Sequence, residues 1–501
     1  MFKQDTITAV ATPPGEGGLA IIRVSGPDAL RIAGLIFHSR AGSDASRYSG
    51  YTVHYGRFID CVTGEVADDG LLTVFRGPHS YTGENTVEFS CHGGRATTAR
   101  VLQLTLDAGA RLADPGEFTQ RAFLNGRLDL AQAEAVADVI RARTESARRL
   151  ARRQLDGALS KTILSLKDAL IGILAAIEVT IDFSDEVGEL DHTSILARIT
   201  IVRQEIQRLL QTADRGRIMR EGLRIAIVGR PNVGKSSLLN ALLRQERAIV
   251  TPIAGTTRDL VEESANIEGV PVVIVDTAGI RESADIVERI GVERARSAAS
   301  SADLVLFVLD ASMAFSREDE IILQQLIAAE EIPIIAVLNK CDQCGPAECQ
   351  NYFAAPGAGS LQALPSTRMR FAYISALTGE GLEELEHRLI RMVFKTEDQS
   401  SSDQSSSDQC SSRERDSEEN SDGNLTDTDA SVVVANARHQ KALEAAHQSL
   451  LEAEQTTQNL LPGDFIVIDV RGALDQLGQI TGETVSEDII HRIFHDFCVG
   501  K

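Results

Sequence analysis

The sequence of 501 residues contains no tryptophan, and aromatic residues make up only 4% of it. Its seven cysteines are odd in number and widely spaced, which argues against a disulfide framework and favours a reducing, cytoplasmic setting. No run of about 18 apolar residues is present, and the first residues lack the apolar core of a signal peptide. We therefore expect neither a membrane span nor a secretory leader.

Basic residues are also in the minority, because 50 Lys and Arg face 72 Asp and Glu and give a net charge of −22. This balance argues against a protein that coats nucleic acid, although a local basic site stays open. Much of the acidity lies in residues 396–430, which are rich in Ser and Asp and nearly devoid of apolar side chains. Such a stretch cannot fold alone. We interpret it as a flexible linker, with a docking tail for a partner as the alternative.

The clearest motif is GRPNVGKSS at residues 229–237, which matches the phosphate-binding pattern G-x-x-x-x-G-K-[ST]. The apolar run at 223–228 predicts a buried strand before it, and the spacing of residues 237–243 predicts a helix after it. In such a unit the backbone N–H groups at the helix N-terminus bind phosphates. Lys235 would reach the β- and γ-phosphates, and the Ser236 hydroxyl would bind Mg²⁺.

Four further segments follow in the order of a GTPase. The segment TPIAGTTRD at 251–259 is predicted to cover the phosphates, with Thr257 completing the Mg²⁺ shell, and VVIVDTAG at 272–279 ends beside the γ-phosphate. The segment IIAVLNKCD at 334–342 ends in Asn-Lys-x-Asp, whose final carboxylate can accept both guanine N1–H and N2–H, so GTP is predicted over ATP. The last segment, ISAL at 374–377, fits the loop that closes over the base. The predicted GTP-binding residues are Asn232, Val233, Gly234, Lys235, Ser236, Ser237, Thr251, Pro252, Ile253, Ala254, Gly255, Thr256, Thr257, Asp276, Thr277, Ala278, Gly279, Asn339, Lys340, Asp342, Ser375, Ala376 and Leu377.

The position that carries a water-orienting Gln in signalling GTPases is Ile280 here, and no arginine finger is evident. The missing groups must come from elsewhere in the chain. Glu282, Glu288 and Glu293 follow shortly, and the amide oxygen of Asn232 can ligate a monovalent cation beside the phosphates. Such a cation would supply the electrostatic stabilisation of an arginine.

Around this segment the chain divides by composition, and we predict a multidomain fold of α+β and α/β parts. Residues 1–125 alternate strand-like and helix-like segments, and residues 221–394 form a Ras-like P-loop GTPase domain. Residues 126–220 and 432–501 are mostly helical and flank the GTPase domain, with the acidic stretch 395–431 before the second flank. Because helical hairpins bury their apolar stripes against other helices, we expect one helical domain built from both flanks.

Several polar clusters outside the GTPase segment leave two interpretations open. Arg23, Glu88 and His92 lie beside Gly-rich turns, either as a small-ligand site or as solvated strand ends. Four arginines share one helical face and form either a solvated surface or a contact to an RNA backbone: Arg148, Arg149, Arg152 and Arg153. A zinc site at Cys341, Cys344 and Cys349 is poorly motivated, because a second ligand pair is lacking.

The domain order, the 251–259 loop, the segment from Ile280 to 291 and the terminal FCVGK together resemble the bacterial MnmE (TrmE) family of tRNA modification GTPases. The resemblance covers almost the whole chain except 396–430, which looks like an insertion. It implies K⁺-dependent GTP hydrolysis coupled to the addition of a carboxymethylaminomethyl or aminomethyl group at C5 of the wobble uridine (position 34) of certain tRNAs. The implied partner is the FAD-dependent protein MnmG (GidA), in a heterotetramer with a homodimer of this chain.

The resemblance also implies site residues. A tetrahydrofolate derivative, 5-formyl- or methylene-tetrahydrofolate, would supply the one-carbon unit and bind an N-terminal folate-binding and dimerisation domain. Its implied ligands are Arg23, Glu88, Lys501 and Arg127, where the family has a lysine; K⁺ would be bound by Asn232, Thr251, Ile253 and Thr256; and Glu288 would orient the attacking water. Cys498 either takes part in the tRNA chemistry as a thiolate or packs as a small apolar residue.

One competing interpretation concerns the function as a whole. A K⁺-dependent GTPase that acts as a binding switch in ribosome or protein assembly would carry similar nucleotide motifs. It would need neither the N-terminal α+β module nor the Cys-x-Gly-Lys tail. A scaffold with a decayed GTPase is disfavoured, because all five nucleotide segments keep their chemical groups. The sequence therefore favours the tRNA-modifying enzyme.

Overall fold

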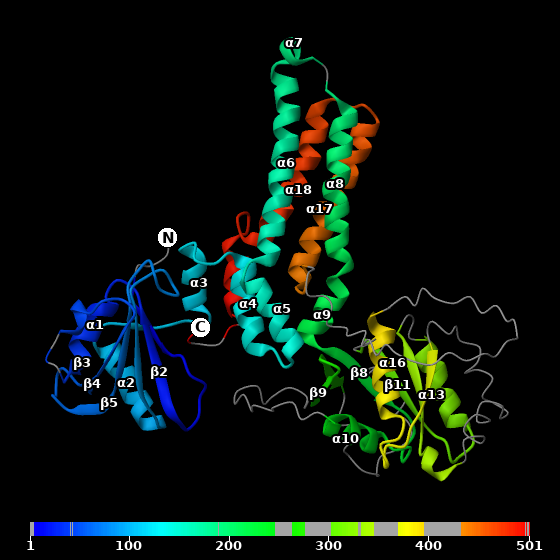
Figure 1. Cartoon of the computed structure of the whole chain (residues 1–501), viewed down its shortest axis with the longest axis horizontal. Helices are drawn as coiled ribbons and strands as arrows, with labels where there is room; N and C mark the ends of the chain where they lie inside the picture. The colour runs from blue at the N-terminus through cyan, green and yellow to red at the C-terminus, as the bar shows by residue number, and fades with distance from the viewer. Residues whose placement is uncertain are drawn as a thin grey trace, which may run out of the picture.

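A computed structural model describes residues 5–40, 42, 44–188, 190–245, 263–275, 302–328, 332–344, 369–394, 432–495, 497 and 500. Figure 1 shows three parts: an N-terminal sheet drawn in blue, a long helical bundle, and a second sheet drawn in green and yellow. The bundle combines cyan and green helices with orange and red ones, so segments far apart in the sequence lie side by side in it.

The N-terminal part is a seven-stranded sheet in the order β3-β4-β5-β6-β2-β1-β7, antiparallel except for the pair of β1 and β7. Side chains alternate along β2, so Ile22 and Val24 are buried against α1 and α2 while Arg23 lies on the other face. The bounds are β1 Ile7–Val10, β2 Gly17–Ser25, α1 Ala29–Ile36, β3 Phe37–Ser39, η1 Ala45–Arg47, β4 Thr52–Ile59, β5 Val66–Phe75, β6 Thr86–Gly93, α2 Arg95–Asp107, β7 Arg111–Leu112 and α3 Glu117–Leu124.

The bundle is built on α6 and α8 from before the second sheet in the sequence and on α17 and α18 from after it. α17 packs against α8 and α18, and α18 packs against α6, so their apolar stripes share one core. The connection between α6 and α8 contains the short helix α7. The bounds are α4 Leu130–Arg141, α5 Glu145–Leu155, α6 Ala158–Asp182, α7 Ser184–Val187, α8 His192–Gln211, α9 Ala213–Glu221, α17 Ala437–Gln458, α18 Gly463–Thr481 and α19 Glu487–His495.

A buried ionic cluster ties the two sequence flanks of the bundle together. Glu134 of α4 is 6% exposed and accepts two hydrogen bonds from Arg438 of α17, at 2.9 Å and 2.8 Å, while the ring of His439 lies 2.7 Å away. Arg438 also donates to the Ile480 carbonyl in α18. Burial alone would raise the pKa of Glu134, but its contacts with His439 and Arg438 lower that pKa to about 2.

The second sheet has six strands in the order β13-β12-β11-β8-β10-β9, all parallel except β9. Two apolar cores cover its faces, as expected for parallel strands that are buried on both sides. The bounds are β8 Leu223–Val228, α10 Lys235–Gln245, β9 Glu263–Ile267, β10 Val270–Val275, β11 Leu304–Asp310, α13 Arg317–Ala328, β12 Ile334–Asn339, η2 Cys341–Gln343, β13 Met369–Tyr373 and α16 Leu382–Phe394.

Helix α9 joins the bundle to this second sheet through the single residue Gly222, whose φ is +94°. Arg220 of α9 donates to Asp138 of α4 at 2.8 Å, and Arg217 donates to Asp303, the residue before β11, at 2.8 Å. Within the described part of the chain, no helix is both long and apolar enough to cross a membrane.

Replacing Glu134 tests the ionic cluster. In Glu134→Leu the Arg438 guanidinium and the buried His439 ring lose their carboxylate partner, so we expect the free energy of unfolding to fall by about 3–5 kcal/mol. Because the folded pKa of Glu134 lies below its ordinary value of 4.5, the wild-type advantage should be complete above pH 4.5 and disappear towards pH 2. Denaturant titrations followed by helical circular dichroism over this pH range measure both effects.

The matched control is Glu145→Leu on α5, whose carboxylate pairs with Arg148 and Arg149 at the surface. Solvent already screens these charges, so loss of the Glu145 carboxylate should leave the free energy of unfolding nearly unchanged. Equal decreases in the free energy of unfolding of the two variants would contradict the conclusion that the buried cluster stabilises the bundle more than a surface ion pair does.

Candidate functional site

The predicted phosphate-binding loop lies between β8 and α10, at the carboxyl end of the central strand of the second sheet. β8 has β10 on one side and β11 on the other, so the loop sits where the connections change direction, the usual ligand position in open α/β sheets. Gly234 has φ +99°, and a Cβ there would lie 2.1 Å from Asn339 Nδ2. Only glycine fits this point of the loop.

Lys235, the first residue of α10, is held inside the loop. Its Nζ donates to the carbonyls of Gly229 at 2.8 Å and Arg230 at 2.7 Å. Burial lowers the pKa of Lys235. A cation and the N-terminal N–H groups of α10 therefore meet at one place, which suits a phosphate group.

The side chain of Asn339 connects three chain segments at the end of β12. Its Nδ2 donates to the Val233 carbonyl at 2.9 Å, and its Oδ1 accepts from the Ala376 backbone N–H at 2.9 Å. Asn339 is 2% exposed, so both hydrogen bonds are shielded from water. The amide thereby fixes the phosphate-binding loop against the loop predicted to close over the base.

Lys340 adds a second connection from the same segment. Its Nζ donates to the Asn232 carbonyl at 2.9 Å and forms an ion pair with Asp310 at 2.6 Å. Burial would raise the pKa of Asp310, but hydrogen bonds from Lys340 and Ser312 outweigh it, and the pKa is lowered. Asp342 follows in η2 with its side chain exposed. The Lys340 ammonium group and the exposed Asp342 carboxylate therefore lie at the same edge of the sheet.

Hydrogen bonds therefore connect the phosphate-binding loop with Asn339, Lys340 and Ala376 from the other end of the segment. The structure describes twelve of the predicted GTP-binding residues, and their role in binding GTP stays a prediction. They are Asn232, Val233, Gly234, Lys235, Ser236, Ser237, Asn339, Lys340, Asp342, Ser375, Ala376 and Leu377. Leu377 is 83% exposed at this edge. The remaining predicted residues lie outside the described part of the chain: Thr251, Pro252, Ile253, Ala254, Gly255, Thr256, Thr257, Asp276, Thr277, Ala278, Gly279, Glu288, Cys498 and Lys501.

The oxygen donors suit Mg²⁺ and K⁺ better than a soft metal. Ser236 places its hydroxyl on the first turn of α10, and Asn232 lies in the loop with φ +64°. Among the described residues, no group of three or more His, Cys, Asp or Glu side chains is arranged to hold a metal ion. Cys341 Sγ donates to the Leu338 carbonyl at 3.3 Å, and Cys349 lies outside the described ranges.

Two charged residues at this edge were not predicted from the sequence. Asp310 pairs with Lys340, and the fully buried Asp319 of α13 accepts from Arg230 at 2.7 Å. Asp310 ends the apolar run of β11, so its place beside the other carboxyl ends could have been inferred. Asp319 looks in the sequence like any acidic residue of a helix N-terminus, and only the fold reveals its partner.

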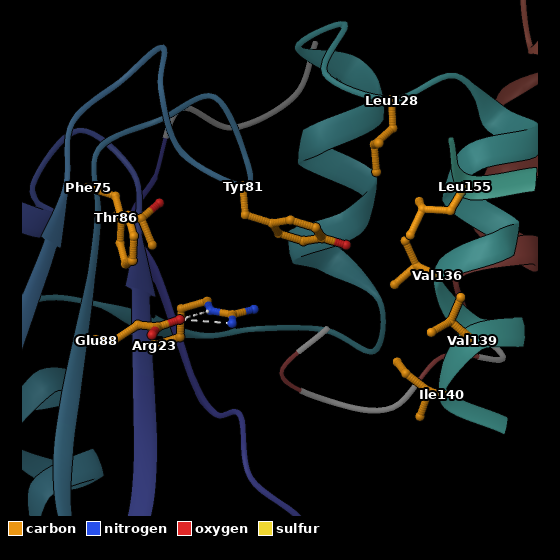
Figure 2. Close-up of a pocket in the computed structure, with 10 residues that line it drawn as sticks. All are labelled: Arg23, Phe75, Tyr81, Thr86, Glu88, Leu128, Val136, Val139, Ile140 and Leu155. Carbon is orange, nitrogen blue, oxygen red and sulfur yellow. Dashed lines mark hydrogen bonds and ion pairs between the residues drawn. The ribbon is translucent and has the colours of Figure 1, made fainter. Parts of the chain in front are cut away.

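A second pocket, of about 430 Å³, lies between the N-terminal sheet and helices α4 and α5 (Figure 2). Arg23 of β2 and Glu88 of β6 are cross-strand partners and form an ion pair at 2.8 Å on one wall. The opposite wall is apolar and includes Val136, Val139 and Ile140 of α4. The pocket thus combines one paired charge with a hydrophobic surface, a common composition for small-ligand sites.

Aromatic rings frame the charged wall. The Arg23 guanidinium lies 5.7 Å from the Tyr81 ring centroid and 5.6 Å from that of Phe118. Tyr81 also hydrogen-bonds Thr119 at 2.8 Å, and burial raises the pKa of its hydroxyl. The carbonyl of Gly500 accepts from Arg23 at 3.4 Å, which brings the C-terminal segment to the pocket.

The other polar residues singled out in the N-terminal part do not join this pocket. His92 is exposed and pairs with Asp68 at 2.8 Å, beside a separate hollow. Arg127 packs against the turn at Gly83, near the pocket but not among its lining residues. A position beside a Gly-rich turn in the sequence therefore does not decide which of these residues lie together. The register of the strands places them on different surfaces.

The arginine-rich face of α5 carries its own counter-charges. Arg148 and Arg149 pair with Glu145, and Arg152 pairs with Asp156. These partners are one turn away on the same helix and largely exposed. The geometry favours a solvated face, and the RNA interpretation stays untested.

The central parallel sheet, the loop around Lys235 and the Asn339–Asp342 segment define a P-loop nucleotide-binding protein of the GTPase class. Two family profiles match the chain: "MnmE helical domain" over residues 130–498 and "GTP-binding protein TrmE N-terminus" over residues 6–127. Proteins called "tRNA modification GTPase MnmE" from Clostridioides difficile and Alkaliphilus metalliredigens are each 43% identical over 100% of both chains. One from Lysinibacillus sphaericus is 44% identical over 99% of both. The chain therefore belongs to the MnmE family.

The crowding at Gly234 leads to a prediction for nucleotide binding. A methyl group in Gly234→Ala would overlap the Asn339 amide and strain a left-handed backbone, so we expect the affinity for GDP to fall by about tenfold or more. Gly64→Ala, with φ +74° but nothing within 4 Å of its Cβ, is the control for strain alone. Titration of a fluorescent GDP analogue measures both. Unchanged affinity in Gly234→Ala would contradict the geometry.

Proposed function

We propose that this chain is a K⁺-dependent GTP hydrolase that acts in tRNA modification. With an FAD-dependent partner of the MnmG (GidA) type, it adds a carboxymethylaminomethyl or aminomethyl group at C5 of the wobble uridine of certain tRNAs. FAD belongs to the partner and not to this chain. Membership of the MnmE family supports the tRNA modification GTPase activity, because full-length relatives carry that name.

The observation that carries the GTPase part is the union of the phosphate-binding loop with the Asn-Lys-x-Asp segment. Asn339 and Lys340 each bond a carbonyl of the loop, at Val233 and Asn232. Asp342 then stands exposed one helical turn further on. A carboxylate there accepts the two N–H groups that guanine offers and adenine lacks, which supports GTP as the nucleotide.

Hydrolysis needs a group to orient water and a positive charge for the transition state. Ile280 can do neither, so we assign water orientation to Glu288 and Mg²⁺ binding to Ser236 and Thr257. K⁺ bound by Asn232, Thr251, Ile253 and Thr256 would supply positive charge beside the phosphates. Lys235, held at the centre of the loop, is positioned to pair with the β- and γ-phosphate oxygens.

The pocket at Arg23 and Glu88 is the proposed site of a tetrahydrofolate derivative. Glu88 offers a carboxylate to ring N–H groups, and Tyr81 and Phe118 flank Arg23 so that a flat ring can lie beside them. Arg127 and Lys501 complete the proposed set. We assign folate binding and homodimerisation to residues 1–125, and a heterotetramer to the complex with the partner.

The tRNA assignment is tested by mass spectrometry of tRNA nucleosides from cells that lack this protein, with and without a plasmid copy. We expect 5-carboxymethylaminomethyl- or aminomethyl-type uridines to vanish in its absence and to return with the plasmid. Unchanged uridines would reject the tRNA function and leave an assembly switch as the better account of the GTPase.

The assignment of K⁺ beside the phosphates predicts that GTP turnover is fast in K⁺ and slow in Na⁺. Glu288→Ala should reduce turnover by about 100-fold or more, because the attacking water loses its orienting group. Glu293→Ala, a nearby change of the same kind, is the control and should keep most activity. Phosphate release assays in the two salts measure these rates, and equal turnover in Na⁺ with an active Glu288→Ala protein would refute the mechanism.

A further inference from the structure

The end of the helical bundle far from both sheets carries an exposed apolar surface. Figure 1 shows that the α6–α8 connection, with α7, and the α17–α18 turn both lie at this end. They are in contact, since a Cβ built on Gly463 would lie 2.8 Å from Ile177 and 3.3 Å from Ile181. Six large apolar side chains of these two turns, each 40–70% exposed, form what we call the tip patch: Ile181, Phe183, Leu460, Leu461, Phe465 and Ile468.

Leu460 gives an independent reason to regard the patch as functional. Its φ is +55°, a left-handed conformation that bulky residues disfavour and that Gly or Asn adopts readily. Its side chain is 70% exposed, so it gains little from burial within the chain. A leucine here is unfavourable for both backbone and solvation, and strained residues of this kind concentrate at binding sites.

The rim of the patch is acidic. Asp182, Asp185, Glu186, Asp191 and Asp464 are exposed around it. The sequence has no Lys or Arg between residues 176 and 194 or between residues 455 and 470. The nearest arginine on α18, Arg471, is already paired with Glu178 at 2.6 Å. The end of the bundle is therefore apolar at its centre and negative at its edge.

This charge excludes several occupants. Phosphate groups of RNA and anionic lipids would be repelled, and a second copy of the tip would meet its own charge. The Ser- and Asp-rich stretch 396–430 is also acidic, with eleven Asp or Glu and two Arg, so it is not complementary either. A protein surface with an apolar centre and a ring of Lys and Arg matches both features.

We infer that the tip patch is the docking surface for a protein partner with a basic rim around an apolar centre. The inference rests on the proposed function, in which the FAD-dependent protein binds this chain and is the occupant. Docking at the tip leaves the phosphate-binding loop and the Arg23 pocket clear, because β8 and α10 beside the loop, and α4 and α5 beside the pocket, lie at the opposite end of the bundle.

The test is isothermal titration of the full-length chain with the purified FAD-dependent partner. A variant with Leu460→Gly, Phe465→Gln and Ile468→Gln should bind about tenfold or more weakly, as expected for loss of central apolar anchors. Leu460→Gly alone relieves the left-handed leucine, so it should retain or raise the Tm while still weakening binding. Ile201→Gln, at a side chain 62% exposed in the middle of α8, is the matched control and should bind like wild type.

The outcomes separate the two hypotheses. Weakened binding in the tip variants with an unaffected Ile201→Gln supports docking at the tip. Wild-type affinity in the triple variant overturns the docking surface and leaves the proposed function intact. Failure of the wild-type chain to bind the partner overturns the pairing within the proposed function as well. Loss of tRNA binding or of self-association in the triple variant, with partner binding intact, would reassign the patch and reject the inference.

Discussion

The bundle depends on one buried carboxylate, Glu134, and on the Arg438 guanidinium and the His439 ring that contact it. An isolated charge at 6% exposure would be too unfavourable to keep, so α4 and the start of α17 must meet at this point. Arg438 extends the cluster to the end of α18. Segments separated by some three hundred residues are thereby fixed in register, while the apolar core alone would tolerate small sliding movements.

Helix α4 also links the two candidate sites. One face supplies Val136, Val139 and Ile140 to the pocket beside Arg23. Another face carries Asp138, which holds Arg220 of α9, the helix that leads into β8 and the phosphate-binding loop. A packed helix between two sites does not prove coupling between them. It does identify the element whose position both sites share.

The sequence predicts the phosphate-binding loop and the segment that contacts it because each is a short local motif; their role in binding GTP stays a prediction. Strand, loop and helix are contiguous around Lys235, and the Asn339–Asp342 segment ends a strand that reads as buried. The long helices followed from their apolar period, and their assembly from both flanks was inferred from the need to bury apolar stripes.

Other features depend on how distant segments pair in the fold and could not be predicted from the sequence. The register of β2 and β6 sets the pairing of Arg23 with Glu88. In the same sheet His92 lies on a different surface, beside Asp68. The ion pair of Arg230 with Asp319 joins residues about ninety positions apart, and no local sequence pattern predicts it. The folate assignment came from resemblance, and only the pocket geometry gives it a physical basis.

The one-residue connection at Gly222 has a consequence for how the chain can vary in length. Helix α9 passes directly into β8, and a Cβ on Gly222 would lie 2.7 Å from Val273, so this joint accepts neither a larger residue nor an added one without strain. The return connection, between α16 and α17, spans residues 395–436 and contains the acidic stretch. Because the entropy of closing a loop grows only with the logarithm of its length, extra residues are inexpensive there. An insertion with two connections of this kind has one connection fixed by packing, so added residues are expected to cost least in the other.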